Sequence, residues 1–174
     1  MNIFKKLFGG SEKAVNSREN KKPDIEKLLS SEDINGSIIE FDNYIGELCS
    51  YGYKMETLTE QQKQFYYNQC LEREINNGGF KQYFYNSGGD FANSTIQSLL
   101  IIGANKTADI LQKAIDQFPN GNVPNHITER QELSEQMQKE TFHVWEELDQ
   151  KFFSYEDDLN TLNMEFIRKN KDGF

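Results

Sequence analysis

The side chains best suited to chemistry lie between Asn76 and Asp90. This stretch places amide and phenol groups between two Gly-Gly pairs, and it holds four of the chain's twelve glycines. Glycine permits positive φ and close backbone approach, so each pair predicts a forced reversal of the chain. One interpretation is a polar pocket for a small molecule, built from Asn77, Gln82, Tyr83, Tyr85 and Asn86. The alternative is packing, in which the amides cap helices and the tyrosine hydroxyls find partners within the fold.

The same stretch has one feature of an anion-binding site. The second glycine pair precedes an expected helix N-terminus, where backbone N–H groups favour phosphate. However, Asp90 occupies the expected cap position and would repel an anion. No lysine follows the glycines in the spacing of a phosphate-binding loop. The sequence therefore does not predict a phosphate site.

Catalytic and metal-binding arrangements are missing from the pattern of residues. Paired acids such as Glu146-Glu147 are sequence neighbours, which do not face each other on a helix. The two histidines, His126 and His143, lie 17 positions apart with no cluster of further ligands or nucleophiles. We therefore expect a protein that is not an enzyme and has no catalytic residues, no cofactor and no metal.

The charge is unevenly distributed along the chain. Residues 1–22 have six basic and two acidic side chains, whereas the remainder has thirteen basic and twenty-six acidic ones. The acidic part would approach phosphates against its own field, so direct binding of nucleic acid is disfavoured. Binding of a basic partner protein is favoured instead.

The apolar spacing predicts an all-α fold. We expect residues 23–174, which have no clean alternating strand pattern, to form one acidic helical domain, and residues 1–22 to form a flexible basic tail. Thr59 with Gln62 predicts a capping box at the start of a helix that stops at the first glycine pair. Asp90 and Asn105 are the expected N-caps of the next two helices.

A long acidic helix is expected over residues 128–153. At about 100° per residue, its apolar side chains and its acidic side chains fall in opposite sectors. Five net charges over about 32 Å are sparser than one per about 3.4 Å on a DNA strand. A second acidic row, such as Glu32, Asp33, Glu40, Asp42 and Glu47, or a dimer partner would have to add to it. The alternative is an ordinary solvated face. The acidic residues of the expected face are Glu129, Glu132, Glu135, Glu140, Glu146, Glu147 and Asp149.

The first eight residues suggest a second kind of function. Residues 1–8 combine four apolar side chains with two lysines and end at a Gly-Gly pair. The segment is too short for a secretory signal or a membrane span. It is compatible with weak contact at a membrane surface, or with a frayed terminus. We expect a cytoplasmic protein, with peripheral contact to the inner membrane surface as the alternative.

The glycine-rich stretch also resembles a known signature. The matching positions are Asn77-Gly78-Gly79-Phe80, Gln82-Tyr83-Phe84, Asn86-Ser87 and Gly89-Asp90. Together they resemble the signature of a bacterial all-helical family whose best-known representative is a DNA-mimic protein. Supporting marks are Ile102-Gly103-Ala104 and Phe118-Pro119, while Gly88 stands where a serine is expected. The resemblance covers roughly residues 31–174.

The resemblance implies an all-α fold, a homodimer, and a carboxylate surface that stands in for DNA phosphates. It implies a basic, DNA-binding protein as the partner. The motif positions are candidate binding residues, with a purely structural role as the alternative. A membrane-tethered interaction module and a small-molecule-binding domain remain the competing hypotheses.

Overall fold

The structure is a computed structural model that describes residues 22–137 and 139–174, apart from the side chain of residue 140. The predicted all-α fold is confirmed, since every regular element in these residues is helical. The α-helices are α1 (Ile25–Leu29), α2 (Ile34–Leu48), α3 (Glu60–Tyr85), α4 (Ala92–Ile102), α5 (Asn105–Ile115), α6 (Ile127–Gln136), α7 (Lys139–Phe152) and α8 (Leu159–Lys169). The short 3-10 helices are η1 (Met55–Thr57), η2 (Ser87–Phe91), η3 (Pro119–Gly121) and η4 (Lys171–Gly173).

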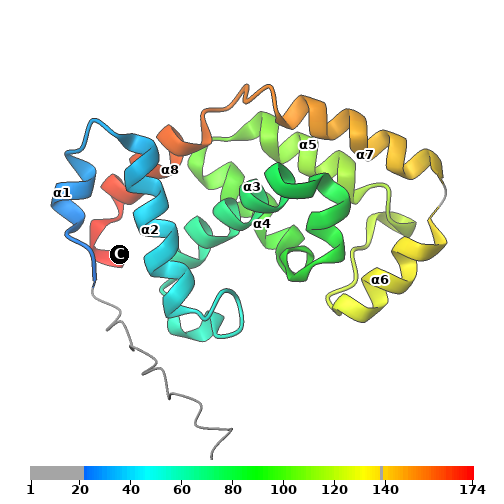
Figure 1. Cartoon of the computed structure of the whole chain (residues 1–174), viewed down its shortest axis with the longest axis horizontal. Coiled ribbons are helices and arrows are strands. Elements are labelled where there is room, and N and C mark those ends of the chain that lie inside the picture. Colours follow the sequence, from blue (N-terminus) through cyan, green and yellow to red (C-terminus); the bar gives the residue numbers. More distant parts are fainter. Residues whose placement is uncertain (1–21, 138) are drawn as a thin grey trace, which may run out of the picture.

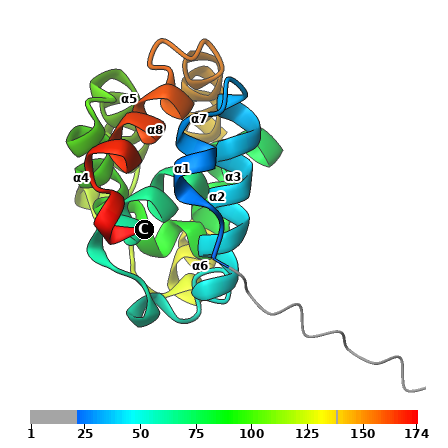
Figure 2. The ribbon, with the colours of Figure 1, turned by 90° about the vertical axis from the view of Figure 1, so that its left-hand side faces the viewer.

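Helix α3 is the central element. It contacts α2, α4, α6, α7 and α8, and Figure 1 shows it running through the middle of the molecule. Helices α1, α2 and α8 gather at the end that faces the viewer in Figure 2. Helix α6 and the start of α7 lie at the opposite end (Figure 1). The folded molecule therefore has two distinct ends, which the long helix α3 joins.

Local capping explains several helix boundaries. Thr59 and Gln62 form the predicted capping box, because each side chain accepts a hydrogen bond from the other's backbone N–H. Helix α4 ends at Gly103, whose φ of 86° suits glycine. The prediction for Asn105 was wrong, because this residue is already inside α5 and Ala104 precedes the helix without a side-chain cap.

The prediction of one long helix over residues 128–153 was also wrong. Helix α6 ends at Gln136, and the extended backbone of the following Met137 (φ −65°, ψ 143°) separates it from α7, which begins at Lys139. Figure 1 shows the two helices meeting at an angle. Arg130 on α6 and Trp145 on α7 are both fully buried.

An aromatic core holds α3, α5 and α7 together. The ring of Phe84 lies 4.8 Å from Phe118 and 5.1 Å from Trp145, measured between centroids. The indole Nε1 of Trp145 donates to the carbonyl of Ala114 at 3.0 Å, so its polar group is satisfied in the core. Cys49 and Cys70 are buried free thiols.

The predictions for the N-terminus lie outside the described residues. They concern the tail over residues 1–22, of which only residue 22 is described, and the membrane contact of residues 1–8. Among the described helices, none combines the length and apolarity needed to cross a membrane. The domain boundary after residue 22 stays a prediction.

Candidate functional site

The first glycine pair kinks α3 instead of ending it. Gly78 (φ −169°, ψ 23°) and Gly79 (φ 71°, ψ −173°) leave helical geometry, and the helix resumes at Phe80. The conformation of Gly79 belongs to a region that only glycine adopts readily. The sequence predicted the special backbone correctly, but it predicted a helix end where the structure has a change of direction.

A carboxylate from α7 caps the resumed helix. Asp149 Oδ1 accepts a hydrogen bond from the backbone N–H of Phe80 at 2.8 Å. A Cβ atom on Gly79 would collide with Asp149 Oδ2, so the glycine is required for this approach as well. Burial raises the pKa of Asp149 above its usual value, while the Phe80 bond opposes that shift. Helical angles placed Asp149 on the outward acidic face, whereas the structure places it half-buried against α3.

Two amides of the motif bridge the kink. Gln82 Nε2 and Asn86 Nδ2 both donate to Glu74 Oε2, each at 2.9 Å. Glu74 precedes the glycine pair and the two amides follow it. The carboxylate therefore links the two halves of α3, and this role accounts for both amides without a ligand.

The aromatic positions of the motif lie in the core. Phe80, Tyr83 and Phe84 are fully buried, and the Tyr83 hydroxyl is paired with Thr95 Oγ1 at 3.1 Å. Burial raises the pKa of Tyr83 well above its usual value. The five-residue pocket of the first interpretation does not form, because the Tyr83 side chain is buried in the core, as the packing alternative has it. An open surface depression joins only Gln82, Tyr85 and Asn86 of that set, together with Gly78 and Lys81.

The second glycine pair allows other side chains to approach the backbone closely. Gly88 and Gly89 are buried in η2, which Ser87 begins at the surface, and neither has positive φ. A Cβ on Gly88 would lie 3.0 Å from the Tyr83 ring, and one on Gly89 would lie 2.6 Å from Arg130 Nε. The predicted capping role of Asp90 was wrong, because α4 starts at Ala92 and Asp90 instead forms an ion pair with Arg130 at 2.5 Å.

Arg130 is the residue that sequence reasoning missed. Its side chain is fully buried, although it lies in the most acidic part of the chain. Its helical angle, about 100° from Glu129, falls in the sector of the apolar side chains, and this was the signal that could have found it. Its guanidinium donates to the carbonyls of Phe84 (2.9 Å), Pro124 (2.8 Å) and Asn86 (2.9 Å).

The comparisons with known proteins identify the family. The model of the DMP19-like protein family matches residues 56–170, which include both glycine pairs, Arg130 and Asp149. The chain belongs to the DMP19-like protein family. The matched range is shorter at both ends than the resemblance described above, and it leaves out α1 and α2. The search of the curated proteins and the search of the solved structures each found no match.

The acidic residues of this DMP19-like chain form two surfaces. On α6, Glu129, Glu132 and Glu135 are all exposed, and we call these three residues the α6 stripe. On α7, Glu146 and Glu147 are exposed, while the side chain of Glu140 lies outside the described residues. The break at Met137 separates the two sets, so the single continuous face that the sequence suggested does not exist.

The second acidic row is partly used inside the fold. Asp33 accepts the Gly36 N–H at 2.9 Å as the N-cap of α2, and Asp42 pairs with Arg73 at 2.5 Å. Glu32, Glu40 and Glu47 are exposed around α2. Because α2 and α6 lie at opposite ends of the molecule (Figure 1), this row cannot directly extend the α6 stripe.

Proposed function

We propose that this DMP19-like protein is a non-enzymatic acidic binding module that occupies the DNA-binding surface of a basic partner protein. The observation that supports it is the charge of α6. The helix exposes three glutamates, and its only basic side chain, Arg130, is buried against the body of the protein. The charged side chains at the surface of α6 are therefore all acidic.

The spacing of the α6 stripe approaches that of a DNA strand. Its glutamates are three residues apart, which corresponds to about 4.5 Å along the helix axis. A DNA strand has one phosphate per about 3.4 Å of axis. If Arg130 were exposed, its positive charge would lower the net negative charge per length of α6. Because Arg130 is buried, the charge density of the stripe is closer to that of a DNA strand. Glu146 and Glu147 on α7 provide further negative charge beyond the break.

The chemistry of the partner follows from this surface. Lysine and arginine side chains that bind DNA phosphates would find carboxylates in comparable positions. The formal net charge of −9 would speed encounter with a basic protein and would oppose contact with nucleic acid itself. A homodimer, as the family resemblance implies, would present two such stripes on one particle.

The test is competition with DNA. The immobilised protein is exposed at low salt to a lysate of its source organism, and bound protein is eluted with duplex DNA at constant ionic strength. We expect a basic DNA-binding protein in the eluate, whose complex also weakens as salt rises. A bound protein that duplex DNA fails to displace would contradict occupation of a DNA-binding surface.

A further inference from the structure

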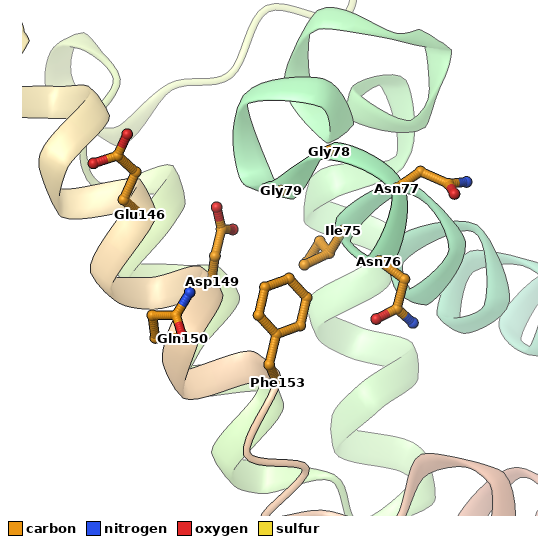
Figure 3. A pocket seen from close by; sticks show the side chains of 9 residues that line it. All are labelled: Ile75, Asn76, Asn77, Gly78, Gly79, Glu146, Asp149, Gln150 and Phe153. Carbon is orange, nitrogen blue, oxygen red and sulfur yellow. The ribbon is translucent and has the colours of Figure 1, made fainter.

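A groove lies between the kink of α3 and the side of α7 that carries Glu146 and Asp149 (Figure 3). Its volume is about 320 Å³, and it is open to solvent. Asn76 and Gly79 line it from α3, and Glu146, Asp149 and Phe153 line it from α7 and the turn that follows. Its lining includes two acidic residues and no lysine or arginine. The groove therefore suits a cation.

The kink makes a carboxylate oxygen available to this groove. Asp149 Oδ1 is engaged by the Phe80 N–H, whereas Oδ2 lies beside the position that a Cβ of Gly79 would fill. Because glycine has no side chain, the wall of α3 next to Oδ2 is bare backbone. Glu146 lies one helical turn before Asp149 on the same side of α7, and its side chain is 73% exposed.

A hydrogen-bond chain orients the acceptor on the opposite wall. Asn76 Nδ2 donates to the Tyr155 hydroxyl at 2.7 Å, and that hydroxyl donates to Glu72 Oε1 at 3.1 Å. With its amide nitrogen held in this way, the carbonyl oxygen of Asn76 is on the groove side in Figure 3. The groove thus has acceptors on both walls, one from a carboxylate and one from a positioned amide.

An aromatic ring lies between these walls. Phe153 is 42% exposed, and Figure 3 shows its ring between Asp149 and Asn76. The face of an aromatic ring attracts a cation through its quadrupole. A large exposed apolar side chain beside two carboxylates is suited to a ligand that is flat, cationic and rich in N–H donors.

We propose that this groove binds an arginine side chain of the basic partner. A guanidinium can stack on Phe153 while its N–H groups donate sideways to Asp149 and Asn76, an arrangement that the compact lysine ammonium matches less well. The burial that raises the pKa of Asp149 makes its charged form costly, and a bound cation would offset this cost. The identity of the occupant as a residue of the partner rests on the proposed function.

The proposal is tested by NMR titration of the full chain with a blocked Gly-Arg-Gly peptide. The reference ligands are the matching lysine peptide and the neutral citrulline peptide. We expect saturable shifts of the Gly78, Gly79 and Phe80 amides with arginine, smaller shifts with lysine and none with citrulline. Equal shifts with citrulline, or arginine shifts centred on the α6 stripe, would overturn the proposal.

Matched variants sharpen the same titration. Phe153→Leu removes the aromatic ring but keeps an apolar side chain, and Glu146→Gln removes one charge of the lining. Each should weaken the arginine peptide by about two- to fivefold, the size of an exposed cation–π or ion-pair contact. Glu40→Gln, which removes the same charge at an exposed position outside the groove lining, and Tyr53→Leu, at a ring that is 89% exposed elsewhere, should leave the affinity unchanged. Wild-type affinity in both groove variants would contradict the site.

The outcome is separable from that of the proposed function, because the peptide titration needs no partner. Arginine binding without a DNA-displaceable partner would leave the groove as a guanidinium site and remove the DNA-mimic proposal. If duplex DNA displaces a bound partner but the arginine peptide shifts no amide of the groove, the arginine site is ruled out and the proposed function stands.

Discussion

The two glycine pairs of the motif have different structural roles. Gly79 has a backbone conformation that other residues avoid, and its missing Cβ admits the Asp149 carboxylate. Gly89 has ordinary φ, and it is required because the Arg130 guanidinium lies against it. One pair therefore sets the direction of α3, and the other admits a side chain from α6.

Substitution of Gly79 tests the first role. Gly79→Ala should lower the free energy of unfolding by about 2–4 kcal/mol, because it combines a strained backbone with a collision at Asp149. Urea unfolding measures the change, with Gly103→Ala as the matched control. Gly103 also has positive φ (86°), but nothing lies within 4 Å of its Cβ position, so its cost should be about 1 kcal/mol. Equal costs would show that the Asp149 contact contributes nothing.

Glu72 gives a prediction about pH. It is largely buried, and this burial raises the pKa of its carboxyl although Tyr155 and Gln69 donate hydrogen bonds to it. A raised pKa in the folded state means that the folded state retains a proton that the unfolded state has lost. The contribution of Glu72 to stability is therefore fully present below the usual carboxyl pKa, and it falls as pH rises through the raised value.

Comparison with Glu72→Gln isolates this term. The difference in unfolding free energy, wild type minus variant, should be largest at acidic pH and should decline across that window before it levels off. Urea unfolding at a series of pH values measures it. A difference that is constant with pH, or that grows as pH rises, would contradict the raised pKa.

Among the elements, α6 is attached to the body in an unusual way. Its buried side chains are Arg130 and Ser134, while Ile127 is 38% exposed and Leu133 is only partly buried. A helix in a globular protein is normally held by an apolar stripe. Here three carbonyls and the Asp90 carboxylate receive the guanidinium, so polar contacts fix the direction in which α6 presents its glutamates.

We call the contacts of Arg130 with the three carbonyls and Asp90 the clamp. Weakening the clamp should release α6 selectively. Arg130→Lys keeps the charge but loses most of the hydrogen bonds to the carbonyls, and it should cost about 2–4 kcal/mol. Asp90→Asn, at a partly exposed partner, should cost less. Hydrogen exchange should accelerate first in the α6 amides, before those of α3.

The control for this prediction is Arg168→Lys. Arg168 is exposed and donates to the Leu29 carbonyl at 3.1 Å, so its replacement should have little effect. Uniform acceleration of exchange across α3 and α6 in Arg130→Lys would show that the clamp belongs to the global fold and does not specifically hold α6.

The elements also show what could be predicted from the sequence. Apolar periodicity and caps predicted the all-α class, the start of α3 at Thr59 and the special backbone at Gly79, because these features depend on local residues. The break at Met137 could not be predicted, since the helical pattern continues through it. The two sides of the break make different tertiary contacts, since Arg130 donates to the carbonyls of Phe84 and Asn86 and Trp145 packs on the Phe84 ring.

The candidate site was less predictable than the fold. The motif was found, but its polar side chains proved to bond within the protein: Gln82 and Asn86 with Glu74, and Asp90 with Arg130. The groove beside Gly79 escaped sequence reasoning because its walls are far apart in the chain, with 77 positions between Asn76 and Phe153. Only the folded arrangement brings Asn76, Asp149 and Phe153 together.

For the whole molecule, the account depends on where the exposed acids lie. Figure 1 places α6 at one end of the molecule and α2 at the other. The α6 stripe is on the first of these helices, and the exposed Glu32, Glu40 and Glu47 are on or next to the second. Removing three charges from either end changes the net charge equally. General electrostatic attraction therefore predicts similar losses of partner binding, whereas a specific acidic surface predicts a loss from one end only.

The most direct measurement is the affinity of the captured partner for two triple variants, Glu129→Gln/Glu132→Gln/Glu135→Gln and Glu32→Gln/Glu40→Gln/Glu47→Gln, at one physiological salt concentration. The account predicts that the α6 variant loses about ten- to a hundredfold in affinity, the size of two or three lost charge contacts, and a flatter dependence on salt. It predicts that the α2 variant binds nearly as the wild type does. Equal losses in the two variants, or a greater loss in the α2 variant, would contradict the assignment of α6 as the surface that replaces DNA.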